Sequence, residues 1–148
     1  MLRNLMVGLP IMLLCLALQA AVSFWSVRYY MRQIEPTAVS RGLFPHLRPL
    51  LVVMIAMMLG NFVQIVIWGV LFLGLGEFNA LYDAVYHSGV NFTSLGYGDV
   101  VMSTRWKLLG PLEAANGVLM FGMTSAALMA ILQHLIKVEL ETRSSRDT

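Results

Sequence analysis

Seven consecutive residues near the two-thirds point of the chain, Thr-Ser-Leu-Gly-Tyr-Gly-Asp at 93–99, could do chemistry with their backbone. Gly96 and Gly98 alternate with Leu95 and Tyr97, and glycine adopts a positive φ without the penalty that a Cβ brings. When left- and right-handed backbone conformations alternate, successive carbonyl oxygens face the same side. Such a row of oxygens can replace the water shell of a cation. The plainer interpretation is a glycine-rich external turn with a capping aspartate.

The elements that must position this stretch are apolar. Of the 148 residues, 58% are hydrophobic and 12% are charged, whereas soluble proteins average roughly 25% charged. Uncharged runs cover residues 5–27, 50–73 and 114–136, and each gives about 35 Å of helix, enough to cross a bilayer. We therefore expect an all-α membrane protein with three transmembrane helices.

The first run has an alternative interpretation as a removable export signal, because it follows Arg3 and ends near the small residues Ala20 and Ala21. However, it is longer than the apolar core of such signals, about 7–15 residues. It also runs on through Trp25 to Arg28, a pattern typical of an interfacial anchor. We predict that it is retained.

The basic residues predict how the chain threads the membrane, because Lys and Arg concentrate on the cytoplasmic side. Seven would share one side: Arg28, Arg32, Arg41, Arg48, Lys137, Arg143 and Arg146. Three would lie on the other: Arg3, Arg105 and Lys107. The expected order is an external N-terminus, a cytoplasmic loop at 28–49, an external segment at 74–107 and a cytoplasmic tail at 137–148.

The external segment contains a short apolar stretch at 80–93, with Asn79 placed to cap a helix. At about 14 residues this stretch is too short to cross the bilayer, so we expect a helix that dips in and returns. Non-helical backbone at membrane depth is tolerated where protein buries it or where it lines a water-filled path. The residues after the helix are expected to be such backbone.

In this setting, Thr-Ser-Leu-Gly-Tyr-Gly-Asp resembles the selectivity filter of potassium channels, whose usual form is Thr-Thr-Val-Gly-Tyr-Gly-Asp. The resemblance is to the pore domain of prokaryotic channels with one pore loop, and it covers residues 50–136. The expected parts are an outer helix at 50–73, a pore helix at 79–93, a filter at 94–99 and an inner helix at 108–136. The first span, residues 1–27, lies outside it.

The resemblance implies K⁺ sites at the carbonyls of four residues: Ser94, Leu95, Gly96 and Tyr97. Thr93 and Gly98 complete the ion-binding stretch, and Asp99 lies at its mouth. One pore loop supplies a quarter of the coordination, so the resemblance implies a homotetramer in the bilayer.

Two departures concern the filter and its support. Ser94 and Leu95 replace the usual threonine and valine. The backbone carbonyls stay in place, but the side-chain hydroxyl of Ser94 is less constrained than that of a β-branched threonine. Tyr86 and His87 stand where many relatives have a tryptophan pair, so we expect hydrogen bonds from Tyr86 to Asp99 and from His87 toward Tyr97. His87 could instead sense external pH, or hold a metal with Asp83.

The inner helix carries candidates for a gate or cavity. Glu113 is the one carboxylate in an apolar helix, and it is either a functional group, a strut behind the pore loop or a partner of Arg105 or Lys107. Either Glu113 or Asn116 could face the cavity.

Two glycines of the inner helix and two amides of the second span complete the candidates. Gly117 and Gly122 fit either a hinge or close packing. Asn61 and Gln64 are expected to make helix–helix hydrogen bonds.

The sequence thus predicts a passive potassium-selective channel subunit, not an enzyme, with no cofactor beyond permeant K⁺ and no nucleic-acid partner. We expect it in a prokaryotic inner membrane. No span contains an arginine, which argues against a voltage sensor. The alternatives are a non-selective cation channel and a non-conducting scaffold or sensor that keeps the pore fold.

Overall fold

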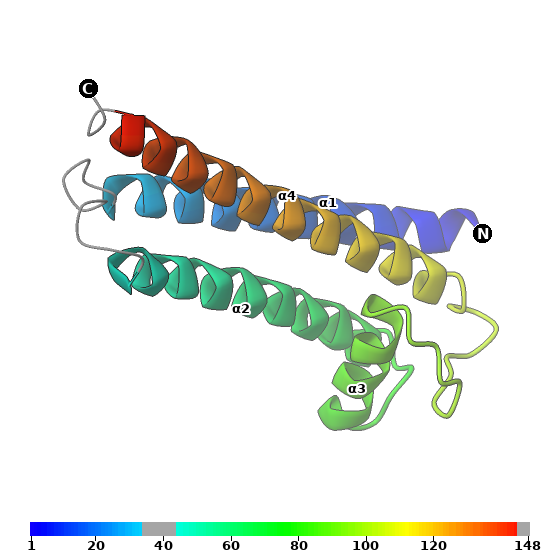
Figure 1. The fold of residues 1–148 in the computed structure, drawn as a ribbon. Coiled ribbons are helices and arrows are strands. Elements are labelled where there is room, and N and C mark those ends of the chain that lie inside the picture. Colours follow the sequence, from blue (N-terminus) through cyan, green and yellow to red (C-terminus); the bar gives the residue numbers. More distant parts are fainter. Residues whose placement is uncertain (34–43, 145–148) are drawn as a thin grey trace.

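A computed structural model of the chain describes residues 1–33 and 44–144. Within these residues it contains no strand and four helices: α1 (Leu2–Gln33), α2 (Phe44–Gly74), α3 (Leu81–Phe92) and α4 (Leu109–Ser144). The three long helices run side by side, and the short α3 lies at one end of them, near the N-terminus (Figure 1). We call this the α3 end; α4 ends, at Ser144, at the opposite end.

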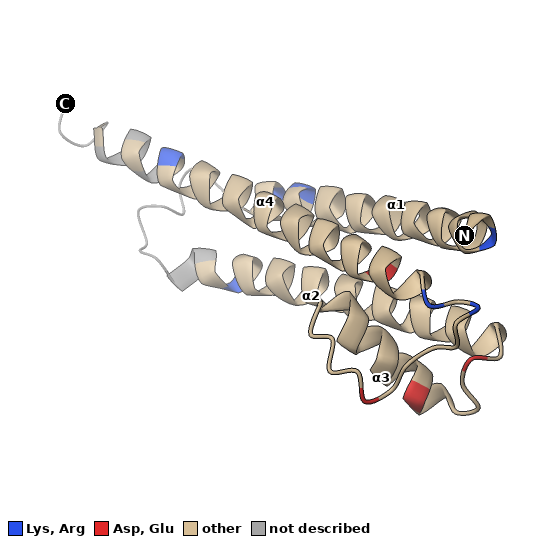
Figure 2. Ribbon diagram, turned by 90° about the vertical axis from the view of Figure 1, so that its right-hand side faces the viewer, with Lys and Arg blue, Asp and Glu red and all other residues tan. Residues whose placement is uncertain are grey.

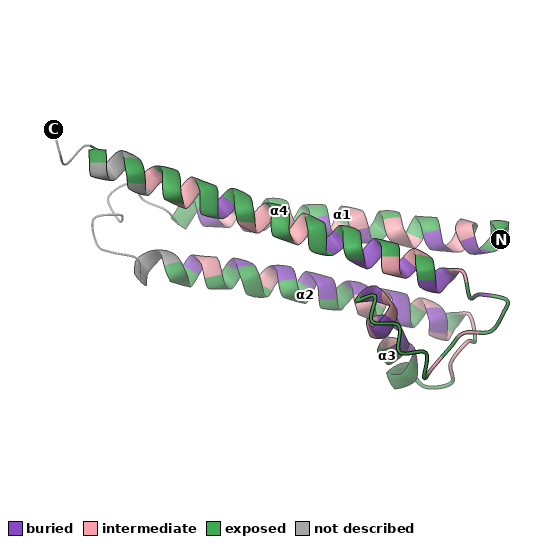
Figure 3. Cartoon of the chain, turned by 45° about the vertical axis from the view of Figure 1, so that its right-hand side comes forward, coloured by how far each residue is buried: buried purple, intermediate pink, exposed green. Residues whose placement is uncertain are grey.

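The three long helices have the length and apolar character to cross a membrane, over Leu2–Gln33, Leu47–Gly74 and Leu109–Val138. Only 17–28% of the residues in their most apolar stretches are buried within the bundle. Exposed residues therefore run along the outer faces of the helices (Figure 3). A surface of this kind is unfavourable in water and suits lipid. The chain is an integral membrane protein.

The helices extend beyond the apolar runs that predict them. α1 continues to Gln33, α2 begins at Phe44, and α4 reaches Ser144, so the first part of the expected tail is helical. Basic residues such as Arg28 mark the edge of the lipid but favour helix, so the helix continues into water. The remainder of the expected loop, 34–43, and of the tail, 145–148, lies outside the described residues.

The short helix α3 begins later than expected, and Asn79 does not cap it. Ala80 occupies the N-cap position with an extended backbone, φ −119° and ψ 138°, and no side chain bonds to the helix start. The prediction for Asn79 was wrong because this residue lies one position before the cap.

Two glycines allow α3 to pack closely between its neighbours. A Cβ added at Gly69 of α2 would lie 2.9 Å from Cα of Val85. A Cβ added at Gly117 of α4 would overlap the carbonyl oxygen of Phe92, the last residue of α3. α3 is thus held against one long helix at Val85 and against another at its C-terminal residue, Phe92, by close contact with its backbone.

The first helix joins the other two. α1 packs against both α2 and α4, which contact each other less. Near its middle, Gln64 Nε2 donates a hydrogen bond to Gln19 Oε1 at 2.8 Å, and Gln19 Nε2 donates one to Thr124 Oγ1 at 2.8 Å. Asn61 Nδ2 also donates to Thr124 Oγ1, at 3.4 Å. The expected helix–helix hydrogen bonds of Asn61 and Gln64 are confirmed.

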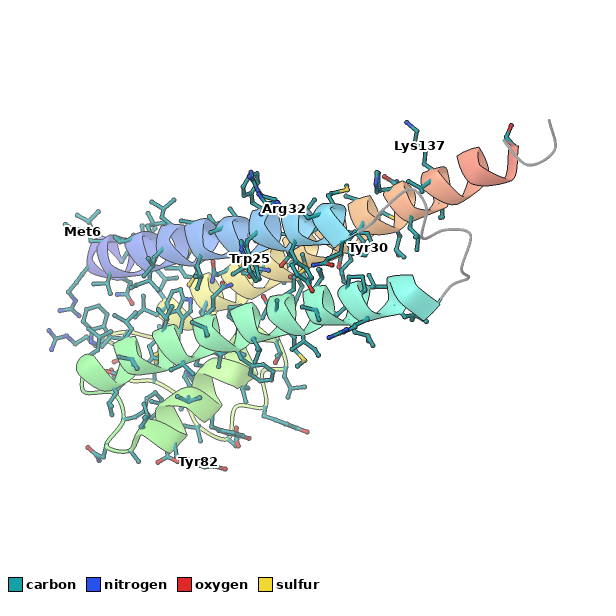
Figure 4. The ribbon with its side chains drawn as sticks, turned by 90° about the vertical axis from the view of Figure 1, so that its left-hand side faces the viewer. Met6, Trp25, Tyr30, Arg32, Tyr82 and Lys137 are labelled. Carbon is teal, nitrogen blue, oxygen red and sulfur yellow. The ribbon has the colours of Figure 1, made fainter. Side chains whose placement is uncertain are left out.

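Two apolar clusters lie at different levels of the bundle. The cluster toward the α3 end consists of Cys15, Trp68, Phe72, Phe92, Trp106, Leu109 and Met120. The cluster toward the opposite end is smaller and consists of Tyr30, Val53, Met57 and Ile131. Figure 4 shows Tyr30 between the long helices, close to Arg32 and far from Tyr82 of α3.

Candidate functional site

Residues 94–99, which we call the glycine segment, have an alternating backbone. The φ values of Ser94, Gly96 and Gly98 are +58°, +62° and +74°, and neither Leu95 nor Tyr97 has a positive φ. The positive φ expected at both glycines is confirmed. Ser94 was missed, because a serine gives no sequence signal for a conformation that costs non-glycine residues roughly 1–2 kcal/mol.

The glycine segment begins directly at the C-terminal end of α3. The backbone N–H of Ser94 donates to the carbonyl of Asn91 at 2.8 Å, and that of Leu95 to the carbonyl of Val90 at 2.9 Å. These bonds take up carbonyls at the helix end that have no partner within a helix. The end of a helix also carries roughly half a negative charge. The first residues of the segment therefore lie where a cation is favoured.

All six residues of the glycine segment are exposed within the part of the chain that the structure describes. Leu95 and Tyr97 are 58% and 72% exposed, and a Cβ at Gly96 or Gly98 would meet no atom within 4 Å. Acidic and basic residues both lie around this region, at the α3 end (Figure 2). The segment thus presents bare backbone among charges of both signs.

Tyr86 and Asp99 join α3 to the far end of the glycine segment. The Tyr86 hydroxyl donates to Asp99 Oδ2 at 2.7 Å, as expected from the sequence. This bond lowers the pKa of Asp99 and raises the pKa of Tyr86. It links two residues that are both on the surface.

His87 has different partners from those expected. Its Nδ1 lies 2.8 Å from the carbonyl oxygen of Val100, and its Nε2 lies 2.9 Å from Asn91 Nδ2. The prediction of a contact with Tyr97 was therefore wrong, because the carbonyl that follows Asp99 comes closer. A carbonyl only accepts, so Nδ1 carries the proton and Nε2 accepts from the amide of Asn91. Burial lowers the pKa of His87, which keeps this neutral arrangement.

A metal site at Asp83 and His87 would need further ligands. Within 1–33 and 44–144, no group of three or more His, Cys, Asp or Glu side chains could hold a metal ion.

Glu113 is a strut behind α3. Ser88 Oγ lies 2.5 Å from the carboxyl oxygen Oε1 and 2.7 Å from the carbonyl oxygen of Ile65. The hydroxyl carries one proton, so it donates to one of these two oxygens at a time. Glu113 is fully buried, and its hydrogen-bond partner is Ser88 rather than Arg105 or Lys107. One serine of α3 thus connects α4 to α2.

The other candidates on α4 divide into buried and open positions. Asn116, like Glu113, is fully buried within the chain, so the expectation that one of the two faces an open cavity is corrected. Gly117 lies against Phe92, whereas a Cβ added at Gly122 would meet no atom within 4 Å. α4 remains helical through both glycines.

Residues 101–108, which we call the connecting segment, run from the glycine segment to α4 and are held by side chains from distant elements. The carboxylate of Glu77 accepts hydrogen bonds from the backbone N–H and the hydroxyl of Ser103, at 2.6 and 2.7 Å. Asn4 Nδ2 of α1 donates to the carbonyl of Arg105 at 3.1 Å. These contacts were missed, because nothing in the sequence pairs residues so far apart.

Comparisons of the chain with curated proteins and with solved structures found no match. A protein-family model described as "Ion channel" matches residues 50–134, which covers more than half of the chain. The match begins in α2, includes α3 and the glycine segment, and ends in α4; it leaves out α1. The chain belongs to this ion channel family.

Proposed function

We propose that the chain is one subunit of a passive, potassium-selective channel made of four identical subunits. The glycine segment is its selectivity filter, and the carbonyl oxygens of Ser94, Leu95, Gly96 and Tyr97 bind the permeating ions. The observation that carries this proposal is the positive φ at every second residue from Ser94 to Gly98. That alternation suits a row of carbonyls that replaces the hydration shell of K⁺.

In this proposal α3 is a re-entrant pore helix. Its 12 residues give about 18 Å of helix, which is less than the roughly 30 Å of a bilayer core. The chain leaves α2 and enters α4 at the same end of the bundle, so α3 and the glycine segment form an excursion from that side (Figure 1). The C-terminal end of α3 then stabilises a cation inside the membrane.

The exposure of the glycine segment supports an assembly. One segment surrounds an ion from one side only, and four copies around an axis complete the coordination. The Tyr97 ring, 72% exposed in the protomer, then packs against the helices of a neighbouring subunit. Asp99, repeated four times, raises the cation concentration at the mouth.

The α3 end faces the outside in this proposal, and the C-terminus faces the cytoplasm of a prokaryotic cell. The charge count supports this orientation, since the first loop and the tail hold most basic residues. Arg32 and Lys137 both lie toward the opposite end, far from Met6 (Figure 4).

Reconstitution into liposomes tests the function. We expect the liposomes to take up K⁺ and Rb⁺ down a gradient. When Na⁺ replaces K⁺ in the solution, the reversal potential should follow the K⁺ equilibrium potential. A reversal potential indifferent to the exchange would instead support a non-selective cation channel, which the Ser94 and Leu95 substitutions make the second candidate. Absence of flux from folded protein would favour a non-conducting scaffold.

A pair of glycine substitutions tests the filter assignment. Gly98 and Gly76 both have a φ of +74°, and a Cβ at either position would meet no atom within 4 Å. Alanine therefore introduces the same backbone strain at both, yet only Gly98 belongs to the glycine segment. We expect Gly98→Ala to abolish selective K⁺ conduction and Gly76→Ala to preserve it. Equal conduction by the two variants would argue against the filter.

A further inference from the structure

The first helix is attached to the connecting segment by a buried polar side chain. Asn4 is 5% exposed, and its Nδ2 donates to the backbone carbonyl of Arg105 at 3.1 Å. Its Oδ1 is buried without a hydrogen-bond partner. A buried unpaired oxygen is unfavourable, so packing alone would be better served by an apolar side chain. The amide is suited to holding the loop.

The neighbouring residue of α1 contacts the same loop. The guanidinium of Arg3 lies 4.5 Å from the ring centre of Trp106, within the range of a cation–π interaction. Trp106 is 6% exposed and belongs to the apolar cluster against which Val7 and Ile11 pack. The first turns of α1 therefore hold both the backbone and a side chain of the connecting segment.

α1 is itself fixed farther along the bundle. Gln19 hydrogen bonds to Gln64 of α2 and to Thr124 of α4, both at 2.8 Å. Asn4 and Gln19 lie 15 positions apart, which corresponds to about 22 Å of helix. α1 is thus held at its middle by two membrane helices and in turn holds the loop at its outer end.

We propose that α1 positions the outer end of the filter, with Asn4 and Arg3 as the positioning residues. These residues act through the connecting segment, which begins two residues after Asp99 and is also held by Glu77. α1 lies outside the part of the chain that matches the ion channel family. This role for α1 rests on the proposed function, and it adds a support to the pore that the matched region does not supply.

The test compares Asn4→Leu with Met6→Leu. Leucine keeps the branched shape of Asn4 and removes its donor, whereas Met6 is 70% exposed on the outer face of α1 (Figure 4). Two measurements are made on the full chain in liposomes: hydrogen exchange of the backbone amides in residues 101–108, and the K⁺ to Na⁺ permeability ratio. Loss of one hydrogen bond should speed exchange about fivefold and lower the ratio by a similar factor. Met6→Leu should leave both unchanged.

Arg3→Gln provides a second variant if Asn4→Leu does not fold, with Arg3→Lys as its conservative partner. We expect Arg3→Gln to speed exchange and Arg3→Lys to restore it, because lysine retains a cation over the Trp106 ring. Unchanged exchange and unchanged permeability ratio in folded Asn4→Leu and Arg3→Gln would overturn the role of α1. Failure of the wild-type chain to select K⁺ would instead overturn the proposed function, and the exchange rates would still decide whether α1 holds the loop.

Discussion

The two ends of the bundle differ in their side-chain hydrogen bonds. At the α3 end, beside the larger apolar cluster, side-chain hydrogen bonds fix Ser88, Val100, Ser103 and Arg105 at defined distances. At the opposite end, the cluster of Tyr30, Val53, Met57 and Ile131 has mainly apolar contacts. Hydrogen bonds require a defined geometry, whereas apolar contacts tolerate sliding.

The difference matches two demands on an ion channel. The proposed filter, which selects by geometry, needs fixed atoms, and it lies at the end with the side-chain hydrogen bonds. A pore that opens needs helices that can separate, and we propose that the opposite end meets that need. The following predictions test this contrast, in order of decreasing effect.

The largest effect is expected at Gly117. Gly117→Ala would drive a Cβ into the carbonyl of Phe92 and should destabilise the protein by about 3 kcal/mol or more. Gly122→Ala has free space and should fold as well as the wild type. Thermal unfolding and the yield of folded protein in detergent measure both. Normal folding of Gly117→Ala would show that α3 does not need this close contact.

A smaller loss is expected at Ser88. Ser88→Ala removes the hydroxyl that joins Glu113 to the carbonyl of Ile65, and should cost about 1–3 kcal/mol. Met57→Leu, in the apolar cluster at the opposite end, nearly conserves volume and should cost less than about 1.5 kcal/mol. Chemical denaturation of the two variants compares them. If Met57→Leu proved the more harmful, the contrast between the two ends would be wrong.

The lowered pKa of His87 predicts that the stability of the protein depends on pH through the α3 end. Burial lowers the pKa of His87 from its ordinary 6.5, so the unfolded chain binds the proton at a higher pH than the folded one. Stability should therefore fall as the pH drops below about 6.5, until the folded pKa is passed. His87→Gln retains a donor and an acceptor but does not titrate, and it should flatten this part of the curve. An unchanged slope in the variant would assign the effect to another group.

The smallest effect is expected at the surface bond between Tyr86 and Asp99. Tyr86→Phe should raise the pKa of Asp99 back toward 3.8, with little change in stability because both groups are exposed. In the wild type, the contribution of the bond is lost as the pH falls through the lowered pKa of Asp99 or rises through the raised pKa of Tyr86. NMR titration of Asp99 measures the shift.

Tyr82→Phe is the matched control for Tyr86→Phe. Tyr82 is 79% exposed on the same helix and does not hydrogen bond to Asp99. If the pKa of Asp99 changed equally in both variants, the hydrogen bond from Tyr86 would not be the cause of its lowered pKa.

The parts of the structure that the sequence predicts depend on local signals. Three uncharged runs give three membrane helices, and an apolar stretch too short to span gives α3. Gly96 and Gly98 indicate their own backbone conformation. The bond between Tyr86 and Asp99 was also predictable, because a known motif places the two residues together.

The parts that the sequence does not predict depend on contacts between distant residues. Asn4 and Arg105 lie 101 positions apart, and Ser103 bonds to Glu77 across α3 and the glycine segment. His87 was given the wrong partner because the path of the backbone after Asp99 decides which acceptor is nearest. The positive φ of Ser94 follows from its place at the end of α3, not from its residue type.

The location of the N-terminus beside the connecting segment has a practical consequence for labelling. Met1 is 89% exposed and lies three residues from the amide that holds Arg105. A fluorescent protein or affinity tag fused there would crowd the connecting segment and, in the proposed orientation, would have to be translocated. Fusions at the far end of α4 avoid both problems, so they are the better choice for imaging and purification.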